Sequence, residues 1–163
     1  MKTNGKINFQ NDSNIYSANI LIDTGASHCF VNQKIFTDSI QSKINDFKLN
    51  SNSNELNLKL FNGLIETINS NKKSCCIIVS LNVRIGNWTG LQEFIISDEI
   101  TNEECILGRD FLKKYNVKID YGTNKMTIGS GLDFEMVYLS LLENYVFFYF
   151  KNLFKKKLTI QRV

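Results

Sequence analysis

Apolar and polar residues alternate along most of the first 130 positions, which is the two-residue period of half-buried β-strands. Gly, Asn and Ser interrupt this alternation at short intervals, as turns between strands do. The pattern therefore predicts an all-β domain built from short strands. The predicted strands cover residues 1–10, 15–23, 26–32, two strands within 45–60 around a turn at 50–54, 64–68, 75–85, 88–96, a short strand beginning at 105, 117–121 and 125–128.

Two glycine-containing turns join long alternating runs. The dipeptide Asn62-Gly63 lies between runs 56–61 and 64–68, which predicts a hairpin with its tip at these two residues. Gly86 and Asn87 predict a second tight turn, between the strands at 75–85 and 88–96.

Residues 105–115 differ from the strand pattern, because a short apolar strand is followed by Gly108 and then by a helical run. Asp110 falls in the first turn of that helix, and Lys113 and Lys114 fall later, as the helix dipole favours. Residues 33–39 allow one helical turn or two. We expect one short α-helix in the body of the domain, near its C-terminal end.

Length and composition divide the chain into a domain over residues 1–129 and a tail over residues 130–163. Apolar residues at 43% and charged residues at 21% are ordinary for a globular domain. The formal charge is +3, but residues 151–163 hold five basic and no acidic residues, so the first 150 residues carry −2. A nucleic-acid-binding domain would spread cations over a folded face, so no nucleic acid is expected on the body.

The tail allows two interpretations. Residues 134–150 are rich in aromatic and aliphatic side chains but include Glu135, Glu143 and Asn144, which favours a buried or interfacial helix. The alternative is a membrane-surface anchor in which the lysines at 155–157 face anionic lipid.

Cysteine and histidine usage argues against a metal or another cofactor. The four cysteines show no C-x-x-C spacing and there is a single histidine, His28, so we expect no metal site. Because residues 1–16 are polar, no signal peptide is expected, and reduced thiols in a cytoplasmic protein are the simplest interpretation. The cysteines are Cys29, Cys75, Cys76 and Cys105.

Asp23 is the first candidate for chemistry. It ends the apolar run at residues 20–22 and precedes Thr24, Gly25 and Ala26. A carboxylate where a buried strand breaks into a tight glycine turn is costly to leave unpaired, which favours a functional role. His28 lacks a supporting nucleophile pattern, so a surface or hydrogen-bonded core role is favoured for it, and a core role for Cys29.

The motifs together resemble the retropepsin family, the aspartic proteases of retroviruses and retrotransposons. They are D-T-G-A at residues 23–26, a glycine-containing flap candidate at 60–65, and I-L-G-R-D-F-L at 106–112. The resemblance covers roughly residues 15–128 and implies a closed acid-protease barrel. The ending K-K-Y-N-V-K-I-D-Y looks most like members from long-terminal-repeat retrotransposons and pararetroviruses.

The resemblance implies that Asp23 is the catalytic residue. One carboxylate cannot act as both acid and base, and the nearest imitation of D-T-G, at residues 120–122, has Tyr121 in place of the hydroxyl residue. The second carboxylate is therefore expected from Asp23 of another copy, in a two-fold homodimer. By the same analogy Thr24 hydrogen-bonds across the dimer axis, while Gly25 and Ala26 keep the floor of the cleft open.

Further roles follow from the same resemblance. An extended peptide would bind in the cleft, with the flap around Gly63 closing over it. The residues expected to touch substrate are Ser27, Gly63, Leu64 and Leu107. The residues expected to support the site are Gly108, Arg109 and Asp110. Arg109 is expected to be buried and to brace the Asp23 loop or the dimer contact, or to meet Asp110 or a backbone carbonyl.

The sequence thus predicts an aspartic endopeptidase that processes the polyprotein of a retrotransposon or pararetrovirus. One alternative is a catalytically dead protease-like domain that serves as a dimerisation or peptide-binding module. Another is a membrane-attached fragment in which the tail dominates.

Overall fold

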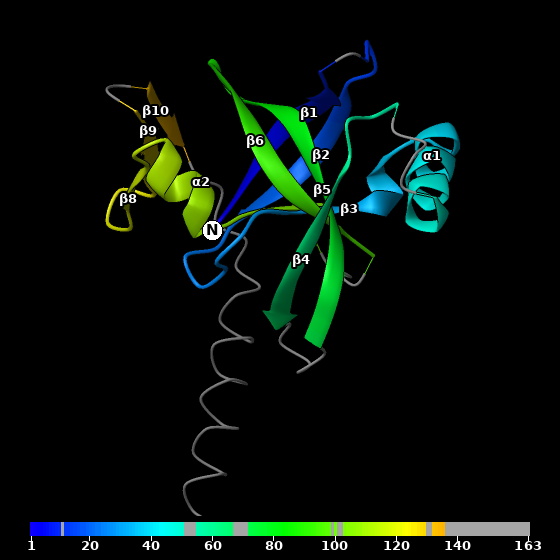
Figure 1. Cartoon of the computed structure of the whole chain (residues 1–163). Coiled ribbons are helices and arrows are strands. Elements are labelled where there is room, and N and C mark those ends of the chain that lie inside the picture. Colours follow the sequence, from blue (N-terminus) through cyan, green and yellow to red (C-terminus); the bar gives the residue numbers. More distant parts are fainter. Residues whose placement is uncertain are drawn as a thin grey trace, which may run out of the picture.

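The main sheet of the computed structural model has seven strands in the order β1-β2-β7-β3-β6-β5-β4. An added β1–β5 pairing closes the first six of these into a barrel and leaves β4 outside it (Figure 1). The structure describes residues 1–10, 12–50, 55–66, 72–98, 100, 103–129 and 132–135. The strands are β1 Lys2–Phe9, β2 Tyr16–Ile22, β3 Phe30–Asn32, β4 Lys59–Glu66, β5 Lys72–Ile85, β6 Trp88–Ser97 and β7 Cys105–Leu107. The predicted fold class, a closed barrel made mostly of strands, is confirmed.

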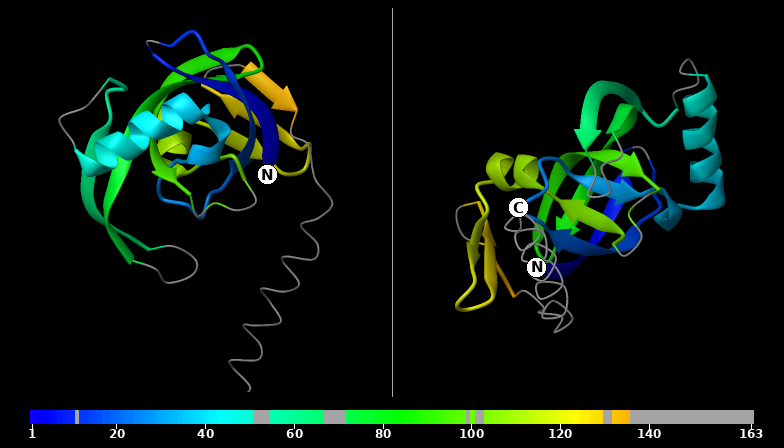
Figure 2. Two further views of the ribbon diagram at one scale, coloured as in Figure 1. Left: turned by 90° about the vertical axis from the view of Figure 1, so that its right-hand side faces the viewer. Right: turned by 90° about the horizontal axis from the view of Figure 1, so that it is seen from below.

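The helices and a second sheet lie outside the barrel. Figure 2 and Figure 1 agree in placing α1 on one side and α2 with the small sheet on the other. The helices are the 3-10 turn η1 Gln33–Ile35, α1 Asp38–Leu49 and α2 Arg109–Lys114, and the small sheet has the order β10-β9-β8, with β8 Lys118–Asp120, β9 Lys125–Ile128 and β10 Leu132–Glu135.

Alternate residues of the barrel strands fill its interior. On β5, Val79, Leu81 and Val83 are fully buried, and the residues between them face outward. β2 shows the same alternation from Tyr16 to Ile22. Each fully buried Val, Leu or Ile side chain contributes about 2 kcal/mol relative to an exposed one. This core fixes the strand ends, and the candidate site lies at one of those ends.

The prediction of strands within residues 45–60 was wrong for its first half. α1 occupies Asp38–Leu49 and buries Ile40, Ile44 and Phe47, a spacing of four and three residues that places them on one helical face. The local alternation of Phe47 with Leu49 imitated a strand. The described residues therefore include two α-helices, not the single short one that we expected. The strand expected at 26–32 is also shorter, since β3 covers only Phe30–Asn32.

The hairpin tip predicted at Asn62-Gly63 was also wrong. β4 runs through both residues to Glu66, which pairs with Lys72 of β5, and the register shifts between Asn62 and Ile65. The dipeptide thus lies where the strand register shifts, as it does at a β-bulge, and glycine is common at such positions. The connection between β4 and β5, at residues 67–71, lies outside the described residues.

Other local predictions were confirmed. Gly86 and Asn87 form the turn between β5 and β6, and Gly86 adopts φ +54° there. The short strand, Gly108 and helix at residues 105–114 are present as β7 and α2.

β structure continues past Gly129, because β10 pairs with β9. Residues 134 and 135, which we expected to begin a helix, belong to this strand, and residues 136–163 lie outside the described residues. Among the residues that the structure describes, no helix is long and apolar enough to cross a membrane.

Candidate active site

Asp23 is held at the end of a central barrel strand. β2 pairs in parallel with β7, with Ile22 opposite Leu107. The next residue extends this ladder, because the Asp23 N–H donates to the Leu107 carbonyl at 3.1 Å. The D-T-G-A and I-L-G-R-D motifs, more than 80 positions apart in the chain, therefore lie side by side.

The Asp-Thr-Gly turn leaves the carboxyl group accessible. The Gly25 N–H donates to Asp23 Oδ1 at 2.8 Å, and the Ala26 N–H donates to the Asp23 carbonyl at 3.3 Å. Asp23 is half-buried, whereas Thr24 and Gly25 are exposed. A backbone N–H aimed at one carboxylate oxygen fixes the direction of the side chain. The carboxyl is thus oriented and lies at a surface that another molecule can reach.

Gly108 allows the two motifs to make contact. The Arg109 N–H donates to the Ala26 carbonyl at 2.8 Å. A Cβ on Gly108 would lie 2.3 Å from the His28 carbonyl oxygen and 2.9 Å from that of Ala26. Both are backbone atoms of the Asp23 loop, so they cannot give way as a flexible side chain would. Only glycine fits here without moving the loop.

A polar network beneath the loop is centred on Asp110. Its carboxylate accepts the Cys29 backbone N–H at 3.1 Å and the Cys29 thiol at 2.9 Å. The same group accepts from the Gln92 amide at 3.4 Å and from the Phe111 N–H at 2.7 Å. Cys29 Sγ in turn accepts the Gly108 N–H at 3.3 Å. These bonds tie β6, α2 and the segment after Asp23 together.

Sequence reasoning missed Gln92, although a signal was present. Gln92 is only 3% exposed and occupies an inward-facing position of β6, two residues before the buried Phe94. A polar residue at an inward position of an alternating strand needs a buried partner. Asp110 is such a partner, because its carboxylate accepts a hydrogen bond from the Gln92 side-chain amide.

Two residue assignments need correction. Leu107, expected to line a substrate pocket, is fully buried in the core, while its neighbour Ile106 is half-buried. Successive residues of a strand face opposite sides, so Ile106 is the residue that faces away from the core. Arg109, expected to be buried, is exposed, and its backbone rather than its side chain contacts the loop. Ser27 is also exposed.

β4 approaches the Asp23 loop through an aromatic contact. The His28 and Phe61 rings lie edge to face with centroids 6.0 Å apart, and both residues are half-buried. Phe61 also packs with the partly exposed Phe30 and Ile78 around buried Cys76 and Ile95. Gly63 and Leu64 follow Phe61 on β4. β4 therefore contacts the segment that follows Asp23 through a residue of the flap candidate at 60–65.

Alkaline pH should destabilise the fold through two buried thiols. Burial raises the pKa of Cys29 and of Cys105 well above the usual range, and the hydrogen bond to Asp110 adds to the effect at Cys29. Above about pH 8.5 the unfolded chain loses these protons while the folded chain keeps them, so the free energy of unfolding falls by about 1.4 kcal/mol per pH unit for each thiol. Cys29→Ser, which keeps a donor for Asp110, should remove one of these two contributions. Urea unfolding from about pH 8 to about pH 10 checks this, and equal slopes for the two chains would contradict it.

Removing the Asp110 carboxylate should weaken the support of the loop. In Asp110→Ala the buried Cys29 N–H loses its acceptor, so we expect the free energy of unfolding to fall by about 2 kcal/mol. Glu93→Ala is the control, since it breaks only the exposed 3.0 Å ion pair with Lys59 and should cost under about 1 kcal/mol. Equal losses in urea unfolding would show that Asp110 has no special role.

A known protein family matches most of this chain. The family described as retroviral aspartyl protease matches residues 12–133, well over half of the chain. The chain belongs to the retroviral aspartyl protease family.

Solved structures with a similar fold include the retroviral protease-like domain of Ddi1 from Leishmania major, at 13% identity and TM-score 0.48, with 85% of this chain and 92% of that chain covered. Another is the protein Lpg0085, of unknown function, from Legionella pneumophila subsp. pneumophila str. Philadelphia 1, at 12% identity and TM-score 0.39, with 72% and 88% covered. A search of curated proteins found no match. Of the residues that the structure describes, no group of three or more His, Cys, Asp or Glu side chains is placed to hold a metal ion.

Proposed function

We propose that this protein is an aspartic endopeptidase that acts as a homodimer, with one Asp23 from each subunit. The observation that carries the proposal is the Asp23 carboxyl, oriented by the Gly25 N–H at 2.8 Å at the end of β2 and half-buried next to the exposed Thr24. A carboxylate that only caps a turn would not require the close backbone contact at Gly108 or the hydrogen bonds to Asp110 that support its loop. The arrangement is suited to holding this one group in a fixed position at a surface.

Hydrolysis of a peptide bond needs an acid and a base, and the chain offers one suitable carboxyl. The other Asp-x-Gly turn begins at Asp120, the last residue of β8 in the small sheet, whose carboxylate accepts the Gly122 and Thr123 N–H groups. A symmetric copy would bring a second Asp23 to the first. The exposed residues Thr24 and Gly25 are those that would meet across the axis.

Two Asp23 carboxyls brought into direct contact at the dimer axis would share one proton and titrate as a coupled pair. The ionised member would take a proton from a bound water while the protonated member polarises the scissile carbonyl. The water attacks directly, so no acyl-enzyme forms. Activity should therefore be highest at mildly acidic pH, at about pH 5.

An extended polypeptide is the substrate that suits the site. Within the described residues, β4 is at the end of the sheet order and pairs only with β5, which leaves its other edge for a peptide backbone. Phe61, Phe30 and Ile106 offer partly exposed apolar surface for side chains. We propose that the natural substrate is the polyprotein of a retrotransposon or pararetrovirus, cut inside the cell.

The test is cleavage of an unfolded protein at about pH 5 with and without a statine-type inhibitor, which mimics the tetrahedral intermediate. We expect endoproteolytic fragments that the inhibitor abolishes. Binding of the polypeptide without turnover would instead support the catalytically dead module. Binding to anionic vesicles that requires residues 130–163, with no cleavage, would support the membrane-attached alternative.

A further inference from the structure

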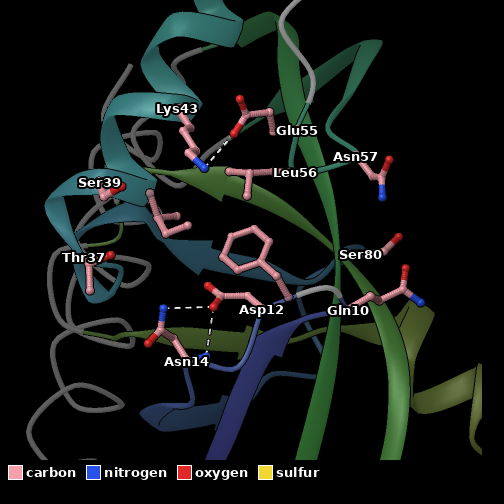
Figure 3. Close-up of a pocket in the computed structure, with 12 residues that line it drawn as sticks. Gln10, Asp12, Asn14, Thr37, Ser39, Lys43, Glu55, Leu56, Asn57 and Ser80 are labelled. Carbon is pink, nitrogen blue, oxygen red and sulfur yellow. Dashed lines mark hydrogen bonds and ion pairs between the residues drawn. The ribbon is translucent and has the colours of Figure 1, made fainter.

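A hollow separate from the Asp23 site lies between α1, the end of β1 and the middle of β5. Its volume is about 310 Å³, within the range of ligand pockets. None of its lining residues belongs to the Asp23 loop, to β7 or to α2. Its lining includes the charged residues Asp12, Lys43 and Glu55 and the apolar residues Phe9, Ile40 and Leu56. Asp12, Lys43, Glu55 and Leu56 are labelled in Figure 3.

One carboxylate oxygen in this hollow has no partner. Asp12 Oδ1 accepts from both the backbone N–H and the side-chain amide of Asn14, each at 2.9 Å. Asp12 Oδ2 is buried and makes no hydrogen bond. A buried carboxylate oxygen without a donor is costly, whereas a charged donor would make a strong hydrogen bond with it. Asp12 is therefore suited to receive a cation.

The lysine of the hollow is already engaged. Lys43 Nζ lies 2.7 Å from Glu55 Oε2, and this bond raises the pKa of Lys43. Figure 3 shows Lys43 with Glu55 and Asp12 with Asn14 as two separate pairs. With Asp12, Glu55 and Lys43 as its charged members, the lining carries a net −1, which favours a cationic occupant.

The remaining walls define the shape of that occupant. Phe9, Ile40 and Leu56 supply apolar surface for an aliphatic stem, and an aromatic ring attracts a guanidinium more than an ammonium. A neighbouring hollow of about 420 Å³ shares Ser39, Lys43, Glu55 and Leu56 with the first. An occupant longer than one residue could continue there along α1.

We propose that this hollow binds an arginine side chain of a polypeptide, with the guanidinium donating to Asp12 Oδ2. Free arginine carries the same guanidinium group, so the experiment compares it with an arginine whose two ends are capped as in a polypeptide. The site does not depend on the chemistry of Asp23, and binding should be unchanged in Asp23→Asn.

The experiment titrates the ¹⁵N-labelled full chain with Nα-acetyl-arginine amide and follows backbone amide shifts by NMR. We expect saturable shifts at Asp12, Asn14 and Ser39 but not at Gly25, with a Kd of about 1 mM. The neutral isostere Nα-acetyl-citrulline amide should produce none. Free arginine should bind no more tightly than the capped form.

Asp12→Asn is the decisive variant, because its side-chain oxygen can still accept from Asn14 while the charge is lost. We expect it to weaken binding about tenfold or more. Asp38→Asn, at an exposed position of α1 outside the lining, is the matched control and should leave binding unchanged. The proposal is overturned by equal binding of citrulline, by unchanged binding in Asp12→Asn, by binding of free arginine alone, or by the absence of saturable shifts.

Discussion

Asp23→Asn is expected to abolish peptide hydrolysis, with a loss of at least about 1,000-fold in kcat/KM. In a homodimer the substitution removes both carboxyls at once, leaving no group able to take a proton from water. The asparagine oxygen can still accept the Gly25 N–H, which now lies 2.8 Å from Asp23 Oδ1, so the turn should be retained. Initial rates on one unfolded substrate at about pH 5 give the measurement.

Asp120→Asn is the matched control for this variant. Asp120 Oδ1 accepts the Gly122 N–H at the same 2.8 Å, in another Asp-x-Gly turn. It lies in the small sheet rather than at the end of β2, so its loss should leave activity within about twofold, as a surface change does. If Asp23→Asn retained activity, or if both variants lost it equally, Asp23 would not be the catalytic residue.

Gly108→Ala is expected to produce the largest loss of stability of any single methyl addition in the site. The new Cβ would lie 2.3 Å from the His28 carbonyl oxygen and 2.7 Å from the His28 carbonyl carbon. Either β7 or the Asp23 loop must move, which breaks the 2.8 Å bond from the Arg109 N–H to Ala26. We expect a decrease of about 3 kcal/mol in the free energy of unfolding, measured by urea titration.

Gly122→Ala tests whether this loss is specific to the site. Its Cβ would lie 3.3 Å from Asp120 Oδ1, a side-chain atom that can shift slightly. The cost should therefore stay below about 1 kcal/mol. Equal destabilisation by the two alanines would refute the steric role of Gly108. The activity of Gly108→Ala should also be lower than that of the unchanged protein, because the contact at Gly108 positions the Asp23 loop.

The two motifs around Asp23 and Gly108 allowed most of the correct predictions about the site. The apolar runs before Asp23 and before Gly108 predicted two buried strands, and both are present as β2 and β7, which pair in parallel. The short helix with Asp110 in its first turn followed from the run after Gly108, and the placement of its charges supported it. These local signals agree with the tertiary structure, so they were readable without it.

The errors occurred where two local patterns competed. In residues 38–49 the helical spacing of Ile40, Ile44 and Phe47 prevailed over a short alternation, because three side chains together reach the core. Asn62-Gly63 favours a turn locally, but β4 continues through it and stays paired with β5 as far as Glu66. Propensity over a few residues is weaker than the energy of a continued strand pair.

Other features of the site could not be read from the sequence, since they depend on close approach in space. No pattern shows that the Gly108 Cα lies against the His28 carbonyl, or that Leu107 faces the core while Ile106 faces outward. The edge-to-face contact between His28 and Phe61 joins segments 33 positions apart. Such contacts follow from the closed barrel and from strand register rather than from any short motif.

The shared catalytic site is tested most directly by one dilution series in which specific activity and sedimentation are measured on the same samples. If each active site takes one Asp23 from each of two chains, specific activity must fall in proportion to the fraction of dimer. Mixing in an excess of Asp23→Asn chains should lower it further, because mixed dimers hold only one carboxyl. Undiminished specific activity in samples that sediment as monomers would contradict the proposal that two chains build the site.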